Sequence, residues 1–240
     1  DGGLWTAYSV NKEDIWIARI PVPILGEEEA AEIEEDFSAP GAFDPWNLYS
    51  PKWAPAGPAQ TGEGTVLRLS DREPYDYCKA ERILKPASRL RVSFTIVPHQ
   101  DTRGSLYIEL LDARGATAVR LILRAGGKLY ARTVCEMPAA SYRAGEPLSI
   151  TAEADCADFR CTLSVNGAPL CGEDGEPVRW PFMQAVNEIS RFALRTGPVR
   201  RSPTLDDVPD GKPEAPLPGC DEPCEEAAYD LVRFSFASLD

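Results

Sequence analysis

Histidine is almost absent from this sequence: the 240 residues contain one, His99. Catalysis by a Ser-His-Asp or Cys-His arrangement would have to use that single imidazole. The sequence also lacks the Gly-x-Ser-x-Gly motif of a nucleophilic serine, a Walker loop and a dinucleotide fingerprint. His99 falls in a turn-like stretch, residues 97–104, and such loops lie on protein surfaces. We therefore expect a solvated loop histidine and no independent active site in the body of the chain.

Positive charge is also scarce. The chain has 25 Lys and Arg against 38 Asp and Glu, a formal net charge of −13. So acidic a chain repels nucleic acids and anionic membranes, and we exclude both as partners. No stretch approaches the ~20 apolar residues of a membrane span, and no signal peptide is present. The sequence begins at Asp1 rather than at methionine, which indicates a fragment or a processed product. The compartment stays open, with an extracellular or periplasmic location favoured.

Cysteine is the exception to this scarcity, and its odd count of seven leaves at least one thiol unpaired within a monomer. Cys161 alternates in step with apolar neighbours, so we expect it in the core. Cys220 and Cys224 could form a local bridge, although free thiols are the interpretation that we favour. A zinc site is disfavoured, because tetrahedral zinc uses paired Cys-x2-Cys ligands and histidines. The seven are Cys78, Cys135, Cys156, Cys161, Cys171, Cys220 and Cys224.

From residue 65 onward the sequence predicts one short strand after another. Apolar and polar residues alternate over residues 89–96, which is typical of a half-buried strand, and the alternation returns several times. Turn residues separate these runs, including the hairpin signal Asn166-Gly167. Residues 183–190 suggest the only short helix, and the Pro-rich residues 198–226 suggest one long loop. About ten strands without interleaved helices predict an all-β, antiparallel β-sandwich, and many sandwiches of this size are jelly rolls.

The N-terminus carries a separate signal. Residues 4–10 and 15–20 are two apolar, aromatic runs separated by Asn-Lys-Glu-Asp, which predicts a hairpin. A lone hairpin is marginally stable in water, so this one must pack on a neighbour. The acidic residues 25–42 that follow are expected to be a surface linker with room for one helical turn.

Three segments resemble a known family. LWTAYSVNKEDIWIARIPVP (residues 4–23) is similar to the closing blade of sialidase-like β-propeller proteins with BNR-type repeats. WNLYSPKWAP (46–55) and YDYCKAERIL (75–84) are similar to the opening of that family's C-terminal jelly-roll domain. The resemblance implies a propeller-blade hairpin at 1–24, a linker at 25–42 and a concanavalin-like jelly roll at 43–240. It also implies a partner, which is the propeller portion of the same protein or of a second chain.

The hairpin loop holds the candidate catalytic residues. Tyr8, Lys12, Glu13 and Asp14 gather a phenol, an ammonium and two carboxylates within seven residues. In sialidases a tyrosine–carboxylate pair supplies the nucleophile. A solvated turn is the alternative interpretation, and the segment lacks the Ser-x-Asp-x-Gly-x-Thr-Trp box of true sialidase blades. Chemistry here would need residues from a propeller.

An aromatic, proline-rich segment after the linker is the candidate carbohydrate site. Sugars stack on exposed aromatic rings while polar side chains hold their hydroxyls. The competing interpretation, which we favour, is packing against a neighbouring domain, because prolines stiffen the segment. The candidates are Asp44, Trp46, Asn47, Tyr49, Lys52 and Trp53.

No motif demands a cofactor, but a structural Ca²⁺ is compatible with the abundant carboxylates. Calcium takes hard oxygen ligands, which Asp71, Asp76, Asp101 and Asp230 could offer. No EF-hand spacing selects among them, and nothing marks two carboxylates as a glycosidase pair.

Two hypotheses follow. In the first, the chain is a non-catalytic carbohydrate-binding or scaffolding β-sandwich, the C-terminal part of a sialidase-like glycan-active protein. In the second, it contributes directly through its hairpin to the active site of a polysaccharide hydrolase or lyase. Either way, the expected partner is a glycan or polysaccharide.

Overall fold

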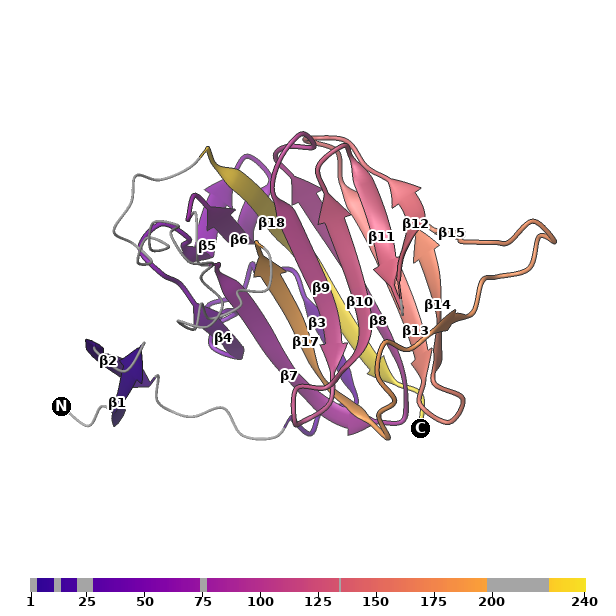
Figure 1. Cartoon of the computed structure of the whole chain (residues 1–240), viewed down its shortest axis with the longest axis horizontal. Coiled ribbons are helices and arrows are strands. Elements are labelled where there is room, and N and C mark those ends of the chain that lie inside the picture. Colours follow the sequence, from indigo (N-terminus) through magenta and orange to yellow (C-terminus); the bar gives the residue numbers. More distant parts are fainter. Residues whose placement is uncertain (1–3, 11–13, 21–27, 74–76, 134, 198–224) are drawn as a thin grey trace, which may run out of the picture.

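The computed structural model describes residues 4–10, 14–20, 28–73, 77–133, 135–197 and 225–240 (Figure 1). These residues form three antiparallel sheets and no helix. Accordingly, the described part of the chain offers no helix long and apolar enough to cross a membrane. The smallest sheet is the N-terminal pair of β1 (Leu4–Val10) and β2 (Asp14–Ile20), whose register runs from Leu4 opposite Ile20 to Val10 opposite Asp14.

One large sheet has seven strands, and its order brings together segments that are far apart in the sequence. Strand β9 lies at its middle, between β10 and β17. In order, the strands are β12 (Glu136–Ser141), β11 (Lys128–Arg132), β10 (Thr117–Arg124), β9 (Ser105–Leu111), β17 (Ile189–Thr196), β7 (Lys79–Ala87) and β4 (Trp46–Tyr49).

The other large sheet has nine strands and is built around the long C-terminal strand β18 (Ala227–Ser238), which pairs with β8 on one side. Figure 1 shows β18 running diagonally through the sandwich. The main path is β15 (Ala168–Pro169), β14 (Arg160–Val165), β13 (Leu148–Asp155), β8 (Arg89–Pro98), β18, β6 (Gly64–Asp71) and β5 (Ala56–Thr61), with β16 (Trp180–Pro181) on β14 and β3 (Glu32–Glu35) on β18.

The core lies between the two large sheets and follows from the period of two along each strand. In β8 the apolar residues Leu90, Val92, Phe94 and Ile96 are all buried, while the intervening polar residues face out. Aromatic rings fill the centre, where Phe192 lies 4.8 Å from Phe234 between ring centroids. The alternation that predicted a sandwich therefore also identified its inner face.

The acidic segment 25–42 differs from the linker expected there, because it contributes β3 to the nine-stranded sheet. Ile33 pairs with Phe236 and is buried, and Phe37 is buried with its ring stacked on Phe43 at 5.3 Å. Strand β3 hides its alternation because each of its residues other than Ile33 is a glutamate. Glu35 then crosses to the other sheet, accepting hydrogen bonds from Arg82 (2.9 Å) and from the Trp46 indole (2.8 Å).

One smaller expectation was wrong, and two others were confirmed. Residues 183–188 form bends rather than the short helix expected at 183–190, and β17 begins at Ile189. Cys161 is buried as expected, with the pKa of its thiol raised to about 12 by burial. The Asn166-Gly167 turn also forms, with both residues at positive φ. Cys78, Cys135, Cys156, Cys161 and Cys171 are free thiols, whereas Cys220 and Cys224 lie outside the described residues.

Candidate functional site

The predicted carbohydrate segment is divided by the fold. Trp46, proposed as part of a sugar platform or as an interdomain contact, is only 4% exposed. It packs edge-on against Phe234, at 5.6 Å between ring centroids, and against Phe192. The Trp46 ring is therefore packed into the core of its own sandwich, and both expectations were wrong for this residue. Asp44 and Lys52 are exposed, and Lys52 lies 4.5 Å above the Trp53 ring.

Asn47 and Tyr49 instead lie on the outward side of the seven-stranded sheet, in two rows that run across it. Asn47 is level with Glu81, and that row continues over the sheet to Glu109. Tyr49 starts the second row and is 47% exposed. The first row is Asn47, Glu81, Ala193, Glu109, Arg120, Arg132 and Glu136; the second is Tyr49, Lys79, Arg195, Tyr107, Ile122 and Tyr130.

These rows, together with the neighbouring outward residues Arg124, Lys128 and Arg191, form a surface that we call the cationic face. It carries seven cations and three carboxylates on an otherwise acidic chain of net charge −13. The cations are Lys79, Arg120, Arg124, Lys128, Arg132, Arg191 and Arg195, and the carboxylates are Glu81, Glu109 and Glu136. A strand that alternates core residues with arginine, as β10 and β17 do, was the signal in the sequence that could have revealed this face.

Ion pairs hold the cationic face in place. Arg120 contacts Glu109 at 2.6 Å, with both side chains largely buried. Arg124 makes two hydrogen bonds to Glu136, at 2.6 and 2.9 Å, and the resulting pair lowers the pKa of the Glu136 carboxyl. Glu81 is paired with Lys79 and with Arg191. Each carboxylate is therefore occupied in fixing cations.

Arg195 lies at the floor of the cationic face. It is 6% exposed and stacks on two aromatic rings, with its guanidinium carbon 4.4 Å from the Tyr107 centroid and 5.2 Å from that of Tyr77. Its Nη1 donates to the Gly197 carbonyl at 3.3 Å, whereas its Nη2 is buried and has no hydrogen-bond partner among the described residues. Burial lowers the pKa of this guanidinium, which is the cost of holding a charge away from water. The free N–H of Nη2 can donate a hydrogen bond to an anionic oxygen of a ligand.

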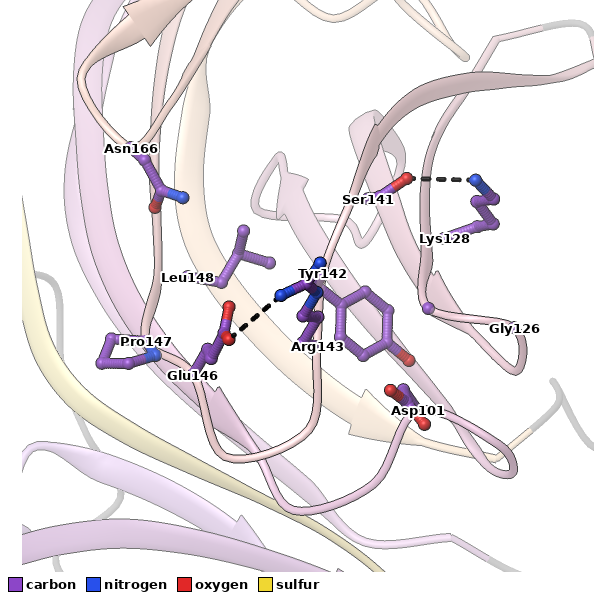
Figure 2. A pocket seen from close by; sticks show the side chains of 11 residues that line it. Asp101, Gly126, Lys128, Ser141, Tyr142, Arg143, Glu146, Pro147, Leu148 and Asn166 are labelled. Atoms are coloured by element: carbon purple, nitrogen blue, oxygen red, sulfur yellow. Dashed lines mark hydrogen bonds and ion pairs between the residues drawn. The ribbon is translucent and has the colours of Figure 1, made fainter.

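A second feature is a pocket of about 280 Å³ at one end of the sandwich, which we call the end pocket (Figure 2). Turns and loops between strands of both large sheets meet there. Figure 2 shows the Tyr142 ring near Asp101, and ion pairing between Arg143 and Glu146. The main polar lining residues are Asp101, Lys128, Tyr142, Arg143, Glu146 and Asn166.

The calcium candidates do not converge. Among the described residues no group of three or more His, Cys, Asp or Glu side chains could hold a metal ion, and Asp76 lies outside them. Asp71 accepts the Glu73 amide, and Asp101 belongs to the end pocket. Asp230 is buried and is bonded by Arg68 (2.7 and 2.8 Å) and by the His99 ring (2.8 Å).

The structure describes the backbone at two of the four candidate catalytic residues of the hairpin. Lys12 and Glu13 are not among the described residues. Tyr8 lies on β1 opposite Trp16, and Asp14 begins β2 opposite Val10. The backbone thus places Tyr8 and Asp14 near the same end of the hairpin.

Comparisons with known proteins agree on the architecture. The family model described as sialidase-like, CBM domain, matches residues 46–211. A solved sialidase is similar over 100% of this chain, at 34% identity and a TM-score of 0.79, and the chain spans 21% of that protein's length. No curated protein matches the chain.

Two further solved structures show the fold alone. A cellulose-induced protein is 11% identical, with a TM-score of 0.57, over 86% of this chain and 97% of its own. Basic winged bean lectin, solved with Tn-antigen, is 8% identical, with a TM-score of 0.50, over 85% of this chain and 96% of its own. The sandwich therefore has the lectin-like, concanavalin-type jelly-roll fold that the alternation and the resemblance predicted.

Proposed function

The chain belongs to the sialidase-like family of carbohydrate-binding (CBM) domains, and we propose that it is the non-catalytic, glycan-binding C-terminal part of a sialidase-like glycan-active protein. The cationic face is the proposed binding surface, and its ligand is a glycan that bears carboxylate or sulfate groups. The observation that carries this proposal is the charge of the face, where seven cations meet three carboxylates on a chain of net charge −13.

The exposure of the cations suggests how a ligand is engaged. Lys79, Arg191, Arg124 and Arg132 keep 31–39% of their side chains exposed and would meet an acidic group first. Beneath them, the unpartnered Nη2 of Arg195 would donate to a carboxylate or sulfate oxygen. Sugar hydroxyls pair with polar side chains along the rows, and an exposed ring such as Tyr49 offers a stacking surface at the edge.

The carboxylates of the cationic face support a binding role. Glu81 and Glu109 lie in the same row on either side of Ala193, so their positions invite comparison with a glycosidase pair. In a glycosidase one carboxyl group must donate a proton to the leaving oxygen. Here both carboxylates are bound by arginine or lysine side chains. They therefore act as counterions that position the cations.

An experiment on Arg195 tests this proposal. The protein is titrated calorimetrically with oligosaccharides that carry uronate, sialate or sulfate groups and with neutral oligosaccharides of the same length. We expect binding of acidic ligands that weakens with added salt. Arg195→Met should weaken it by about tenfold to a hundredfold, because a charge-assisted hydrogen bond is lost.

Matched variants control for folding. Arg91→Met removes a half-exposed arginine from the outward side of the other sheet and should leave binding unchanged. Lys79→Met repeats the test at a partly exposed position of the cationic face, in case Arg195→Met lowers stability. Equal affinity for acidic and neutral ligands, with no effect of either variant on the cationic face, would contradict the proposal.

The hairpin motivates the alternative function, a direct contribution to a hydrolase or lyase site of a larger protein. The similarity to the sialidase covers 100% of this chain, so it includes β1 and β2. Tyr8→Phe in the full-length parent protein separates the two functions. Loss of turnover with unchanged glycan affinity would favour the alternative, and unchanged turnover would favour the binding module.

A further inference from the structure

We propose that the end pocket, which borders the cationic face and shares Lys128 with it, is a second binding site that takes one neutral sugar residue. Its volume of about 280 Å³ lies at the small end of ligand pockets, which hold roughly 300–1,000 Å³. A single sugar ring suits this size, whereas an extended chain suits the open face of a sheet.

The pocket is preformed by its backbone. The Gly126 and Gly127 amides donate to the Asp101 carbonyl at 2.6 and 3.0 Å, and the Tyr142 amide donates to the Gly127 carbonyl at 2.9 Å. Gly127 has φ +63°, and a Cβ there would lie 2.6 Å from the Tyr142 carbonyl oxygen. Three segments distant in sequence are thereby locked together. A rigid site binds its ligand without the entropic cost of ordering its own loops.

The charges of the end pocket balance, in contrast to those of the cationic face. Asp101 and Glu146 supply two carboxylates, and Lys128 and Arg143 supply two cations. Two of the four are paired with each other, Arg143 with Glu146 at 3.7 Å. An ion of either sign would meet a like charge as well as an opposite one. Balanced charge therefore favours a neutral, polar ligand.

The hydrogen-bonding groups of the pocket match hydroxyls, which both donate and accept. The Asp101 carboxylate accepts one long bond, 3.4 Å from the Ala144 amide, and a carboxylate has about four acceptor sites. Asn166 Oδ1 accepts the Ser149 amide at 3.0 Å, which turns the side-chain NH₂ toward other partners. Figure 2 shows Asp101 and Asn166 on opposite sides of the pocket, with Tyr142 between them.

Tyr142 stays a neutral wall of the pocket. Burial, reinforced by the charge of Asp101, raises its pKa to about 12, and its hydroxyl donates to the Arg124 carbonyl at 2.9 Å. The phenol is therefore protonated across the physiological range. The hydrogen bond from Tyr142 to Arg124 connects the end pocket to β10, at the edge of the cationic face.

The test uses the full ¹⁵N-labelled chain. D-Galactose, D-glucose, D-mannose, L-fucose and N-acetyl-D-glucosamine are added singly, and the amide signals of Gly127, Ala144 and Asn166 are followed by NMR. We expect at least one sugar to shift these signals. Asp101→Asn should weaken its affinity about tenfold by removing the ionised acceptor. Glu146→Gln, at a 63% exposed side chain, should weaken it severalfold without affecting the fold.

The controls separate the two sites. Glu173→Gln changes an exposed carboxylate outside the pocket and should leave affinity unchanged, as should Arg195→Met on the cationic face. Three results would each overturn the inference: no sugar shifts the pocket amides, the shifts fall only on the cationic face, or both pocket variants bind like the wild type. If Asp101→Asn does not fold, Glu146→Gln decides. Failure of acidic glycans to bind the cationic face would leave this site standing.

Discussion

The outward sides of the two large sheets are built from the same alternation but carry different chemistry. On the nine-stranded sheet, short hydroxyls pair across strands, as Ser93 with Thr151 at 2.9 Å and Thr95 with Ser149 at 2.9 Å. The Arg91–Glu153 ion pair on this sheet, at 2.7 Å, is half exposed on both sides. On the seven-stranded sheet, the corresponding positions are arginines, tyrosines and glutamates.

Burial is the property that separates these two surfaces. Glu109, Tyr107 and Arg195 are 5–6% exposed although they face away from the core. Holding charge out of water costs free energy unless it is paired or serves a ligand. Water can satisfy most outward polar groups of the nine-stranded sheet at no such cost, and the buried Asp230 is the exception. The difference teaches that buried charge, more than charge alone, distinguishes the face for which we propose glycan binding from the opposite face.

The largest effect that we expect comes from breaking the buried ion pair of the cationic face. Glu109→Ala leaves Arg120 without its counterion in a largely buried setting and should destabilise the protein by about 3–5 kcal/mol. Glu153→Ala makes the same change on the opposite sheet and should cost about 0–1 kcal/mol, since that pair is solvated. Urea unfolding of both variants measures the difference. An equal loss of unfolding free energy in both variants would show that burial does not distinguish the two faces.

A medium effect is expected at Asp230, the one strongly buried carboxylate on the outward side of the nine-stranded sheet. Burial opposes ionisation there, but hydrogen bonds from Arg68 and His99 outweigh it, and the pKa of Asp230 is lowered. The ionised Asp230 therefore contributes its full stabilisation of the folded state above the unfolded pKa, about 3.9. That stabilisation is lost as the pH falls through the folded pKa.

The variant Asp230→Asn tests that sign. It should destabilise the protein by about 1–3 kcal/mol at pH 7, because bonds to a charged group are lost. The gap between wild type and variant should narrow as unfolding is repeated at pH 5, 4 and 3. A gap that widens in acid would show that Asp230 does not carry the stabilising charge.

A smaller effect than at Asp230 should come from the solvated hydroxyl pairs. Ser93→Ala removes one side of the bond to Thr151 on a partly exposed surface and should cost about 0.5–1.5 kcal/mol, with glycan binding unchanged. Thermal unfolding and a repeat of the glycan titration measure both quantities. Weaker glycan binding in this variant would place the glycan site on the nine-stranded sheet and contradict the proposal.

Local patterns predicted much of this molecule correctly. The alternation in β8 identified an inner face, and Asn166-Gly167 predicted a turn that the structure contains. The acidic residues before β4 were misjudged as a linker, because Ile33 and Phe37 are too few among the glutamates to show a period. The prediction for Trp46 was wrong too, because the local sequence around a tryptophan among prolines is the same whether the ring contacts a sugar, another domain or its own core.

The sequence by itself determined the fold class, the hairpin and the resemblance to the sialidase-like family, because each depends on residues close together in the chain. Only the tertiary structure decided which charged residues share a surface. Asn47, Glu81, Glu109 and Arg120 become neighbours in one row through the registers of β4, β7, β17, β9 and β10. Strand order and register are set by hydrogen bonds between segments up to about two hundred residues apart and by burial of a shared core. No short-range pattern carries that information, and so the cationic face and the end pocket appeared only when the strands were assembled.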